Sequence, residues 1–370
     1  MTKQAPHHKI RVGIMFGGKS AEHEVSLRSA KNVLEALDPS KYDAVLIGID
    51  KDGSWHHGNQ AQLMGAKDGG TVSQLTDGSH ALTMVPGGAE RAIIEHEAND
   101  AATRLDVVLP ILHGPMGEDG TVQGLLELAD LPYVGPSVLG AAIGMDKDVM
   151  KRLLRDAGIQ TARYQLLKSA TREAVDFGEI IESLGLPLFV KPANMGSSVG
   201  VSKAHNLEEL EQAVSLAFDF DTKVIVEEAI VGAEVECAVL GNAHPEASVV
   251  GKIIPTHEFY SYESKYLDEN GAVLEIPAKL SPEVSEAVRA MALKTYEVLE
   301  GQGMARVDMF VTEENTIFVN EVNTIPGFTS ISMYPKLWEA SGIGYSELIG
   351  RLIELAIERH AERSRLRTSQ

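Results

Sequence analysis

The chain has 370 residues, of which 44% are hydrophobic and 23% are charged. Because typical domains contain ~100–150 residues, two or three globular domains are expected. The formal net charge of -20 excludes the basic face that a nucleic acid or an anionic membrane surface requires. The single cysteine excludes an internal disulfide, and neither a run of ~20 apolar residues nor the apolar core of a signal peptide is present, so a cytoplasmic protein is expected.

The first part of the chain, residues 1–136, is predicted to form an open parallel sheet of the Rossmann-like kind. Apolar runs predict strands at residues 9–16, 44–49 and 106–112. A helix at 26–37 follows the first strand, and such β-α-β alternation places helices on both faces of a parallel sheet. Residues 51–104 interrupt this rhythm and are expected to form a loop-rich excursion with one hairpin.

A smaller α+β unit is expected over residues 137–231. Asp146 is a suitable N-cap for a helix that begins beside it. Further strands are predicted at residues 161–167, 186–191 and 223–228, and further helices at 171–184 and 206–218.

The last part, residues 232–370, is expected to contain long antiparallel strands from Glu234 onward. Cys237 lies in an apolar run there, which favours a buried core residue over a reactive thiol. Ser281 starts a helix over 281–301, with proline at its first position. A final helix is predicted near 345–358, and the polar tail from Arg359 is expected to fray.

A polar turn at residues 312–315 between two apolar runs predicts a β-hairpin in this last part. Arg306 and Asp308 precede the turn two positions apart, and Glu321 and Asn323 follow it two positions apart, so each pair shares one face of its strand. Folding the hairpin brings the pairs together and offers only oxygen ligands, which suits Mg²⁺ and not zinc. The alternative is an edge hairpin with a solvated polar face.

Residues 13–20, GIMFGGKS, match the formal P-loop pattern. The residues that should wrap phosphates continue an apolar strand instead, and Glu22 and Glu24 follow where phosphate would gather negative charge. These carboxylates suit an ammonium group better, although acids are also favoured in a solvated first helical turn.

A second candidate phosphate site is the loop at residues 191–200, KPANMGSSVG, which lies between two strand-like runs at 188–190 and 199–201. Its N–H groups and hydroxyls can close over a triphosphate, although an ordinary hairpin fits equally well. Five charged candidate residues precede the hairpin of residues 306–323, which we call the metal hairpin. They are two lysines, Lys147 and Lys191, two carboxylates at the end of an apolar strand, Glu227 and Glu228, and a further carboxylate, Glu234. This order offers cations for phosphate, an adenine edge, a ribose carboxylate and a metal cage.

Aromatic residues in the loop at 256–275 favour a lid over a plain surface loop; the loop contains Tyr260, Tyr262, Lys265 and Tyr266. After the metal hairpin, Gly327 can present its N–H group to a ligand, and Ser332 can reach a carboxylate.

Together these motifs resemble the D-alanine–D-alanine ligases of the ATP-grasp superfamily. The similar segments are residues 17–26 (GGKSAEHEVS), 112–121 (LHGPMGEDGT), 144–147 (GMDK), 191–200, 262–266 (YESKY) and 306–332. They follow the family's order over nearly the whole chain, and residues 51–104 match poorly. The resemblance implies domains at 1–136, 137–231 and 232–370, the last two being the lobes of an ATP-grasp fold.

The resemblance also implies an ADP-forming ligase that joins two D-alanines through an acyl phosphate, for peptidoglycan precursor synthesis in the cell wall. It further implies ATP as cosubstrate, two Mg²⁺ ions for which Mn²⁺ can substitute, and a homodimer.

By the same resemblance, Glu22 binds the first substrate's ammonium group, and Ser197 and Tyr266 hydrogen-bond with Glu22 to hold the lid. His113 lies near the first substrate, Arg306 and the Gly327 N–H stabilise the oxyanion, and Ser332 receives the second carboxylate. The implied ATP-binding residues are Lys147, Lys191, Ser197, Glu227, Glu228, Ala229, Ile230, Glu234 and Lys265; the implied metal ligands are Asp308, Glu321 and Asn323.

Three alternatives remain open at this point. A D-alanine–D-lactate ligase differs in its acceptor, although Ser264-Lys265-Tyr266 looks like the dipeptide-forming type. A P-loop nucleotide-binding switch would use Lys19, and a catalytically silent ATP-grasp module would have no use for a complete metal cage.

Overall fold

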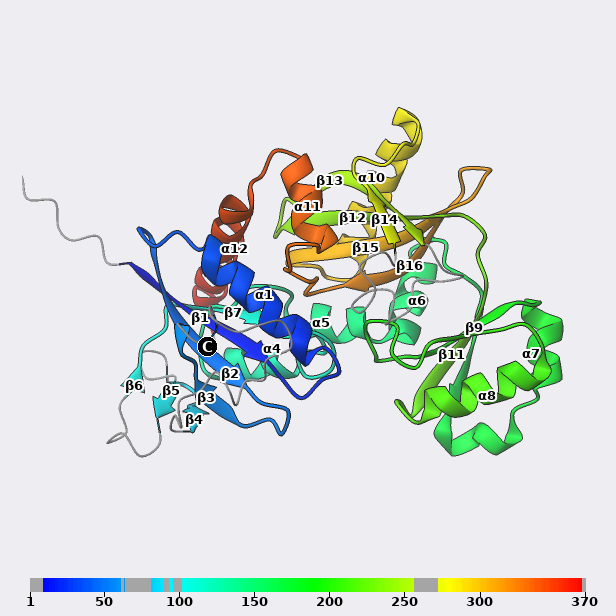
Figure 1. The fold of residues 1–370 in the computed structure, drawn as a ribbon, viewed down its shortest axis with the longest axis horizontal. Helices are drawn as coiled ribbons and strands as arrows, with labels where there is room; N and C mark the ends of the chain where they lie inside the picture. Colours follow the sequence, from blue (N-terminus) through cyan, green and yellow to red (C-terminus); the bar gives the residue numbers. More distant parts are fainter. Residues whose placement is uncertain are drawn as a thin grey trace, which may run out of the picture.

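The computed structural model describes residues 9–60, 63, 81–88, 93–95, 102–255 and 272–367. These residues form four β-sheets with helices packed against them, a mixed α/β architecture (Figure 1). Within the described ranges, no helix combines the length and the apolar character needed to cross a bilayer.

The amino-terminal sheet has the strand order β3-β2-β1-β7. Strand β1 (Ile10–Gly17) runs parallel to both β2 (Tyr42–Ile49) and β7 (Val107–Ile111), which confirms the predicted parallel sheet. The short β3 (Trp55–His57) adds to β2 in the antiparallel direction. All residues of β7 are buried, as expected for a strand covered on both faces.

Helix α1 (His23–Ala36) begins before the predicted start at Ser26. The Ser26 hydroxyl accepts a hydrogen bond from the Gly17 N–H at 2.7 Å and donates one to the Ile111 carbonyl. Ser26 therefore lies inside the first turn and ties α1 to the carboxyl ends of β1 and β7. This contact places Glu22, the residue before the helix, at the edge of a parallel sheet where ligands commonly bind.

The described part of the 51–104 excursion is more ordered than predicted, because β4 (Leu82–Met84), β5 (Ile93–Glu95) and β6 (Ala102–Thr103) form an antiparallel sheet. Helices α4 (Thr121–Leu128) and α5 (Val138–Met145) have no counterpart among the predicted elements. The sequence of α5, VLGAAIGM, has no polar face, so no helical period marks it.

The second part has a sheet of order β10-β9-β11-β8 with α7 and α8 packed against it. Its elements are β8 (Tyr164–Lys168), α7 (Phe177–Leu184), β9 (Leu188–Pro192), β10 (Ser202–Ala204), α8 (Leu207–Phe218) and β11 (Lys223–Glu228). The predicted helix at 171–184 is too long, because Asp176 caps α7 through the Gly178 and Glu179 N–H groups and residues 169–174 form a 3-10 turn. The strand expected at 199–201 begins instead at Ser202.

The carboxy-terminal sheet is antiparallel, as predicted, with the order β14-β13-β12-β15-β16. Its elements are β12 (Ala233–Gly241), β13 (Glu246–Pro255), β14 (Ala272–Glu275), α10 (Pro282–Val298), β15 (Gly303–Val311), β16 (Ile317–Asn323) and α11 (Met333–Ala340). Alternate residues of β12 face opposite layers. Cys237 is buried on the α10 side, as predicted, whereas Ala238 faces α11.

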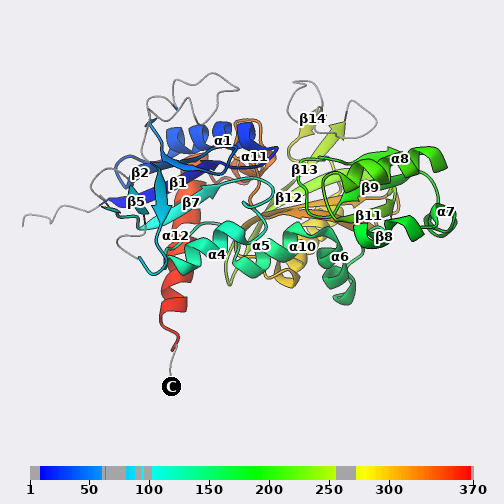
Figure 2. The ribbon, with the colours of Figure 1, turned by 90° about the horizontal axis from the view of Figure 1, so that it is seen from below.

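The last helix, α12 (Tyr345–Ser364), runs past the predicted end, so the first part of the tail expected to fray from Arg359 is helical as far as Ser364. Figure 2 shows α12 beside the strands of the amino-terminal sheet. Arg359 donates hydrogen bonds to the carbonyls of Gly135 at 2.5 Å and Tyr133 at 2.7 Å, and its guanidinium lies 4.5 Å from the Tyr133 ring centre. A polar side chain is thus held at an internal contact that the sequence pattern did not reveal.

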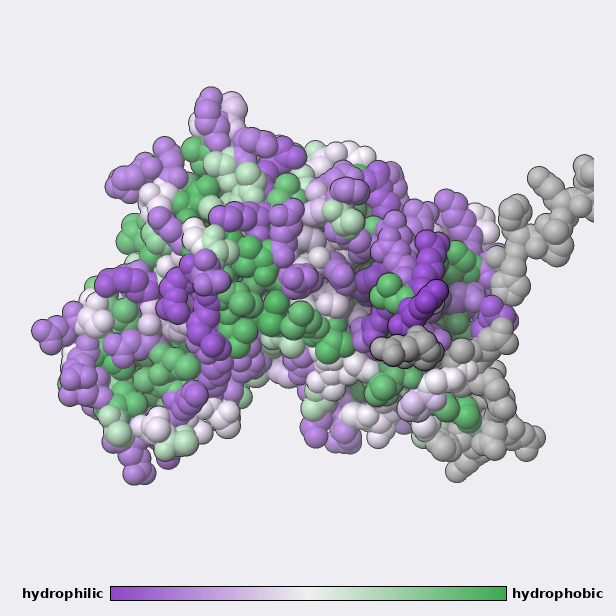
Figure 3. All heavy atoms as spheres, turned by 180° about the vertical axis from the view of Figure 1, so that it is seen from behind, coloured by the Kyte–Doolittle hydropathy of each residue, from purple (hydrophilic) through white to green (hydrophobic). Residues whose placement is uncertain are grey.

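The face opposite to that of Figure 1 mixes hydrophilic and hydrophobic areas, and its outline is notched between the lobe of α7 and α8 and the amino-terminal part (Figure 3). One hydrophobic core joins β1 and β7 to α11 and α12. The domain boundaries at 136 and 231 stay a prediction.

Candidate active site

The metal hairpin forms as the residue spacing predicts. In the pairing of β15 with β16, Arg306 lies opposite Asn323 and Asp308 lies opposite Glu321. The Asn323 amide donates a hydrogen bond to Asp308 Oδ2 at 2.9 Å. The hairpin therefore brings all four side chains onto one face of the sheet.

Arg306 is held by two carboxylates. It makes a bidentate contact with Asp308, with Nε–Oδ1 and Nη2–Oδ2 distances of 2.7 Å, and its Nε lies 2.9 Å from Glu236 Oε2. Burial opposes the charge of Arg306, but Asp308 and Glu236 outweigh burial and raise its pKa well above the ordinary value. Glu236 was not among the predicted site residues; it lies opposite Asp308 in the pairing of β12 with β15.

Both lysines expected for phosphate lie beside carboxylates from other segments. Lys147 Nζ is 3.4 Å from Glu321 Oε2 and donates to the Met195 carbonyl at 2.8 Å. Lys191 forms an ion pair with Glu227 and donates to Asn320 Oδ1 at 3.1 Å. Lysines of the middle of the chain thus meet Asn320 and Glu321 of its last part at one place.

Helix α6 (Lys147–Asp156) carries the first of these lysines and is fixed at its start. The Asp146 carboxylate accepts hydrogen bonds from the Asp148 and Val149 N–H groups, which confirms the predicted N-cap. Lys223 Nζ on β11 lies 2.8 Å from Asp146 and 2.7 Å from Asp148, so the helix start is held against that strand.

Glu227 ends the buried part of β11 and faces two cations. Its Oε2 is 3.0 Å from Lys151 Nζ, and its Oε1 pairs with Lys191. Burial alone would raise the pKa of Glu227, but the two lysines outweigh burial and hold it at about 2. Lys151 was not predicted as a site residue.

The expected adenine edge follows Glu227. The Glu228 carboxylate is bound by Arg163 at 2.7 Å, and the Glu228 and Ala229 N–H groups donate to the carbonyls of Arg163 and Pro187. Ile230 is half-buried, and the half-buried Glu234 lies close enough to raise the pKa of Lys191. The Glu228 side chain and two of the amides are therefore occupied within the fold.

The amino-terminal part meets the phosphate loop at Glu22. This buried carboxylate accepts a hydrogen bond from the Ser197 hydroxyl. A Cβ atom at Gly114 or Gly196 would lie 2.6 or 2.8 Å from Glu22 Oε2, so a side chain at either position would displace this carboxylate, and the φ of 76° at Gly114 also favours glycine there. Ser197 itself has a φ of 50°, a conformation that serine seldom adopts and that aims its hydroxyl at Glu22. Tyr266, Lys265, Tyr260 and Tyr262 lie outside the described residues, as do residues 256–271 of the expected lid; its last residues, 272–275, form strand β14 instead of a loop.

His113 is buried, and both of its ring nitrogens are engaged. Nδ1–H donates to the Ile325 carbonyl at 3.0 Å, and Nε2 accepts from the Ser29 hydroxyl at 3.2 Å, which in turn accepts from the Phe328 N–H. Burial lowers the pKa of His113, so the neutral ring of this hydrogen-bond network is favoured. His113 therefore ties α1 to the loop that carries Gly327.

Glu118 is a second buried link to the same loop. Its carboxylate accepts hydrogen bonds from the Gly114 N–H at 2.8 Å and the Ile325 N–H at 2.9 Å. Burial and the nearby Glu22 raise the pKa of Glu118 to about 8, because together they outweigh the two N–H groups and Arg306, which lower it. Both polar groups of the Ile325 backbone are thus held from the amino-terminal part of the chain.

Glu118 was missed although it lies within residues 112–121, a segment that already carried the family resemblance. Downstream of Ile325, a Cβ atom on Gly327 would lie 2.9 Å from Ser332 Oγ, and this hydroxyl is 2.7 Å from Thr329 Oγ1. Gly327 and Ser332 are therefore adjacent, as their assigned roles require.

Asp308, Glu321 and Asn323 offer the oxygen chemistry that Mg²⁺ prefers. Among the described residues, no group of three or more His, Cys, Asp or Glu side chains is arranged to hold a metal ion. The expected cage contains only two carboxylates and an amide, and these are bound to Arg306, Lys147 and one another. The donor set fits the ion, provided that these ion pairs exchange.

The P-loop alternative does not fit the geometry. The Gly17 N–H is bound to Ser26, the Gly18 N–H to the Ile49 carbonyl at 2.7 Å, and the Ser20 N–H to the Gly18 carbonyl at 3.0 Å. These amides cannot wrap a phosphate while they make those bonds.

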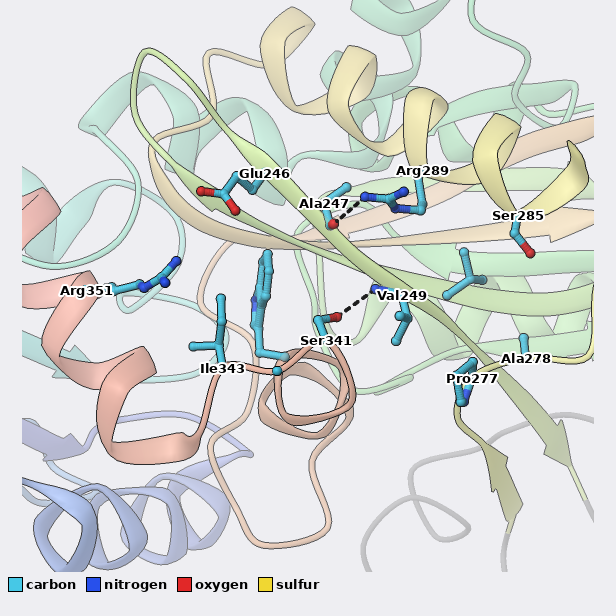
Figure 4. A pocket seen from close by; sticks show the side chains of 13 residues that line it. Glu246, Ala247, Val249, Pro277, Ala278, Ser285, Arg289, Ser341, Ile343 and Arg351 are labelled. Atoms are coloured by element: carbon cyan, nitrogen blue, oxygen red, sulfur yellow. Dashed lines mark hydrogen bonds between the residues drawn. The ribbon is translucent and has the colours of Figure 1, made fainter. Parts of the chain in front are cut away.

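A separate cavity of about 620 Å³ lies between β13, α10 and the segment that joins α11 to α12 (Figure 4). Arg289 on its wall donates to the Ala247 carbonyl at 3.1 Å, and Ser341 accepts from the Val249 N–H at 2.9 Å. None of the predicted site residues lines this cavity.

Comparison with known proteins gives consistent matches along the chain. The family profile described as D-ala D-ala ligase N-terminus matches residues 11–136, and that described as D-ala D-ala ligase C-terminus matches residues 153–354. The chain is 54% identical to D-alanine–D-alanine ligase A of Escherichia coli (strain K12) and 52% identical to the D-alanine–D-alanine ligase of Oceanobacillus iheyensis, in each case over 98% of this chain and 99% of the relative.

Solved structures show the same relationship. The D-alanine–D-alanine ligase of Coxiella burnetii superposes with a TM-score of 0.85 at 38% identity, covering 96% of each chain. A D-Ala:D-Ser ligase of Enterococcus faecalis superposes with a TM-score of 0.84 at 37% identity, covering 94% of this chain and all of the other.

Proposed function

Because the chain belongs to the D-alanine–D-alanine ligase family, we propose that it joins two D-alanines in an ATP-dependent reaction. The products are D-alanyl-D-alanine, ADP and phosphate, and the dipeptide serves peptidoglycan precursor synthesis in the cytoplasm. The observation that carries the proposal is the meeting of Lys147 and Lys191 with Glu321 and Glu227, next to a loop whose Ser197 hydroxyl donates to the Glu22 carboxylate.

The proposal includes the arrangement of the chain. Residues 1–136 form a Rossmann-like domain that precedes the ATP-grasp fold, and residues 137–231 and 232–370 form its two lobes. The parallel order of β2, β1 and β7 and the two antiparallel sheets support this division.

In the first step, the carboxylate of the first D-alanine attacks the γ-phosphate of ATP and forms an acyl phosphate. Glu22 binds the ammonium group of this substrate, and Ser197, with Tyr266, holds Glu22 in place. His113 lies near this substrate and positions the loop of Gly327 through Ile325.

The nucleotide lies between the second and third parts of the chain. Lys147, Lys191 and Lys265 neutralise phosphate oxygens, which is the main demand of phosphoryl transfer. The adenine and ribose contact Glu227, the backbone of Glu228, Ala229 and Ile230, and Glu234, whereas Ser197 binds ATP from the loop at 191–200 that closes over the triphosphate. Asp308, Glu321 and Asn323 hold two Mg²⁺ ions, or Mn²⁺ in their place, which supply further neutralisation of phosphate charge.

In the second step, the amine of the second D-alanine attacks the acyl carbonyl and expels phosphate. Arg306 and the Gly327 N–H stabilise the oxyanion that develops on this carbonyl, as preorganised donors do. Ser332, whose hydroxyl lies against Gly327, receives the carboxylate of the second D-alanine.

The acceptor is D-alanine in this proposal. Relatives at 52% and 54% identity are D-alanine–D-alanine ligases, so a D-lactate acceptor is not favoured. The D-Ala:D-Ser ligase among the structural relatives shows that a similar fold also serves another acceptor. A homodimer is also proposed, by analogy with the family.

The test is ADP release in a coupled assay with ATP and Mg²⁺, comparing D-alanine, L-alanine and D-lactate at neutral pH. We expect release with D-alanine, none with L-alanine, and no mixed product with D-lactate. ADP release that does not depend on D-alanine would contradict the proposal.

A further inference from the structure

Lys151 lies on the buried face of α6, and its residue is 1% exposed. Its Nζ is 3.0 Å from Glu227 Oε2 and 5.8 Å from the centre of the Tyr164 ring. Burial lowers the pKa of this lysine, and Glu227 opposes that effect. Burying the charge of a lysine costs free energy of folding, and a charged partner must offset this cost.

Glu227 is the carboxylate that two lysines share. Lys191 reaches one oxygen from β9, and Lys151 reaches the other from α6. The residue is 3% exposed, so water contributes little to the hydration of its charge. The two lysines differ in accessibility, because the Lys191 side chain is 13% exposed and that of Lys151 is 1% exposed.

Binding of a nucleoside triphosphate requires these ion pairs to exchange. Lys147 and Lys191 leave Glu321 and Glu227 for phosphate oxygens. In the proposed function a divalent cation would take the place of Lys147 at Glu321, whereas adenine would bring only a neutral amino group to Glu227. Without another cation, Glu227 would be left as a buried charge with no counter-ion.

We propose that Lys151 is a positioning residue for nucleotide binding: it stays paired with Glu227 when Lys191 moves to the triphosphate. It thereby keeps the Glu227 carboxylate ionised and oriented to accept a hydrogen bond from the adenine amino group. The inference rests on the proposed function, because it takes the nucleotide site from there.

This role predicts that Lys151 contributes more to the binding affinity of a ligand that carries phosphates than to that of a ligand without them. Adenosine leaves Lys191 at Glu227, so Lys151 is then one of two counter-ions. ADP draws Lys191 away, and of the two lysines that the structure places at Glu227 only Lys151 then remains. A purely structural lysine would affect both ligands equally.

The experiment compares the full-length chain with Lys151→Met by calorimetric titration with ADP and adenosine, and by steady-state kinetics. We expect the Kd for ADP and the KM for ATP to rise roughly tenfold, the Kd for adenosine to change less than about twofold, and kcat at saturating ATP to stay within about twofold. Arg152→Met, an exposed neighbour on the same helix, is the matched control and should change none of these values.

A second variant keeps the test decisive if Lys151→Met folds poorly. In Glu227→Gln the carboxylate that needs a counter-ion is gone, so adding Lys151→Met should not weaken ADP binding further. Equal losses for ADP and adenosine, no loss for either, or the same loss in the Glu227→Gln background would overturn the inference. Wild-type protein that binds no ADP would instead contradict the proposed function.

Discussion

On the nucleotide side of the site, long side chains pair with one another; these residues are Lys147, Lys151, Lys191, Glu227 and Glu321. On the amino-acid side, the buried side chains of His113 and Glu118 bind the backbone of Ile325, which lies in another segment. Ion pairs between side chains can exchange when a charged ligand arrives, whereas bonds to the backbone hold a loop in place. We therefore expect the nucleotide side to rearrange when its ligand binds and the amino-acid side to stay fixed.

The largest effect is expected from Arg306, which lies between the two sides. Arg306→Met removes a donor to the oxyanion, so kcat should fall roughly a thousandfold, about 4 kcal/mol of transition-state stabilisation. Single-turnover kinetics with D-alanine and ATP measures this loss in the chemical step.

The variant also leaves Asp308 and Glu236 without their shared cation, so its unfolding temperature must be checked alongside. Arg289→Met, which removes an arginine from the separate cavity, is the control. A kcat within about tenfold of wild type would remove Arg306 from the chemistry.

The next largest effect tests whether Lys191 or Lys19 binds the phosphates of the nucleotide. Lys191→Met should weaken ADP binding roughly a hundredfold, because it removes a charge-assisted contact to phosphate and leaves Asn320 and Glu227 with one partner fewer. Lys19→Met should leave ADP binding unchanged, since the amides beside it are already bound within the fold. Calorimetric titration of both variants decides the matter, and the reverse result would restore the P-loop alternative.

A smaller effect is expected from Glu118, on the side that stays fixed. In Glu118→Gln one of the two N–H groups, of Gly114 or of Ile325, faces an amide N–H₂ that cannot accept its hydrogen bond, so the link between these two segments weakens and the Gly327 N–H shifts. We expect kcat to fall about tenfold with an unchanged KM for ATP. Steady-state kinetics separates the two constants, and Glu127→Gln, on α4 outside the site, is the control.

Equal losses in kcat and in the affinity for ATP would mean that Glu118 acts on the whole fold rather than on this loop. That outcome would contradict the proposed difference between a nucleotide side that rearranges and an amino-acid side that stays fixed.

The sequence predicted the nucleotide side better than the amino-acid side, and the reason is physical. The pairs Arg306–Asp308 and Glu321–Asn323 lie two positions apart on a hairpin, so strand alternation alone brings them together. Asp146 sits at the start of α6 with the residue type that N-caps require. Local rules of this kind can be read from one sequence.

Glu118 and Lys151 could not be found in that way. Glu118 binds the backbone 207 positions away, and Lys151 on α6 pairs with Glu227 on β11. Neither contact leaves a periodic pattern, and Arg359 at the end of α12 was misjudged for the same reason. A polar residue with a distant partner looks like a solvated one until the fold is known.

The smallest effect concerns the charge of Glu118 itself. Burial and Glu22 raise its pKa to about 8, whereas in the unfolded chain it lies near ~4.3. The native protein therefore keeps a proton that the unfolded chain has lost, so the stability from this group is fully present below the unfolded pKa and is lost as pH rises towards 8. Glu118→Gln does not titrate, and every other group is common to both proteins.

The free energy of unfolding of wild type minus that of Glu118→Gln should therefore decrease by about 1 kcal/mol per pH unit between about pH 5.5 and 7.5. Urea unfolding of both proteins across this range measures the difference. A difference that stays constant would mean that the Gly114 and Ile325 N–H groups and Arg306 keep the carboxylate ionised. The amino-acid side would then depend on an ionised carboxylate, as the nucleotide side does. The two sides would differ only in the partner of that carboxylate, which is backbone N–H on the amino-acid side and lysine on the nucleotide side.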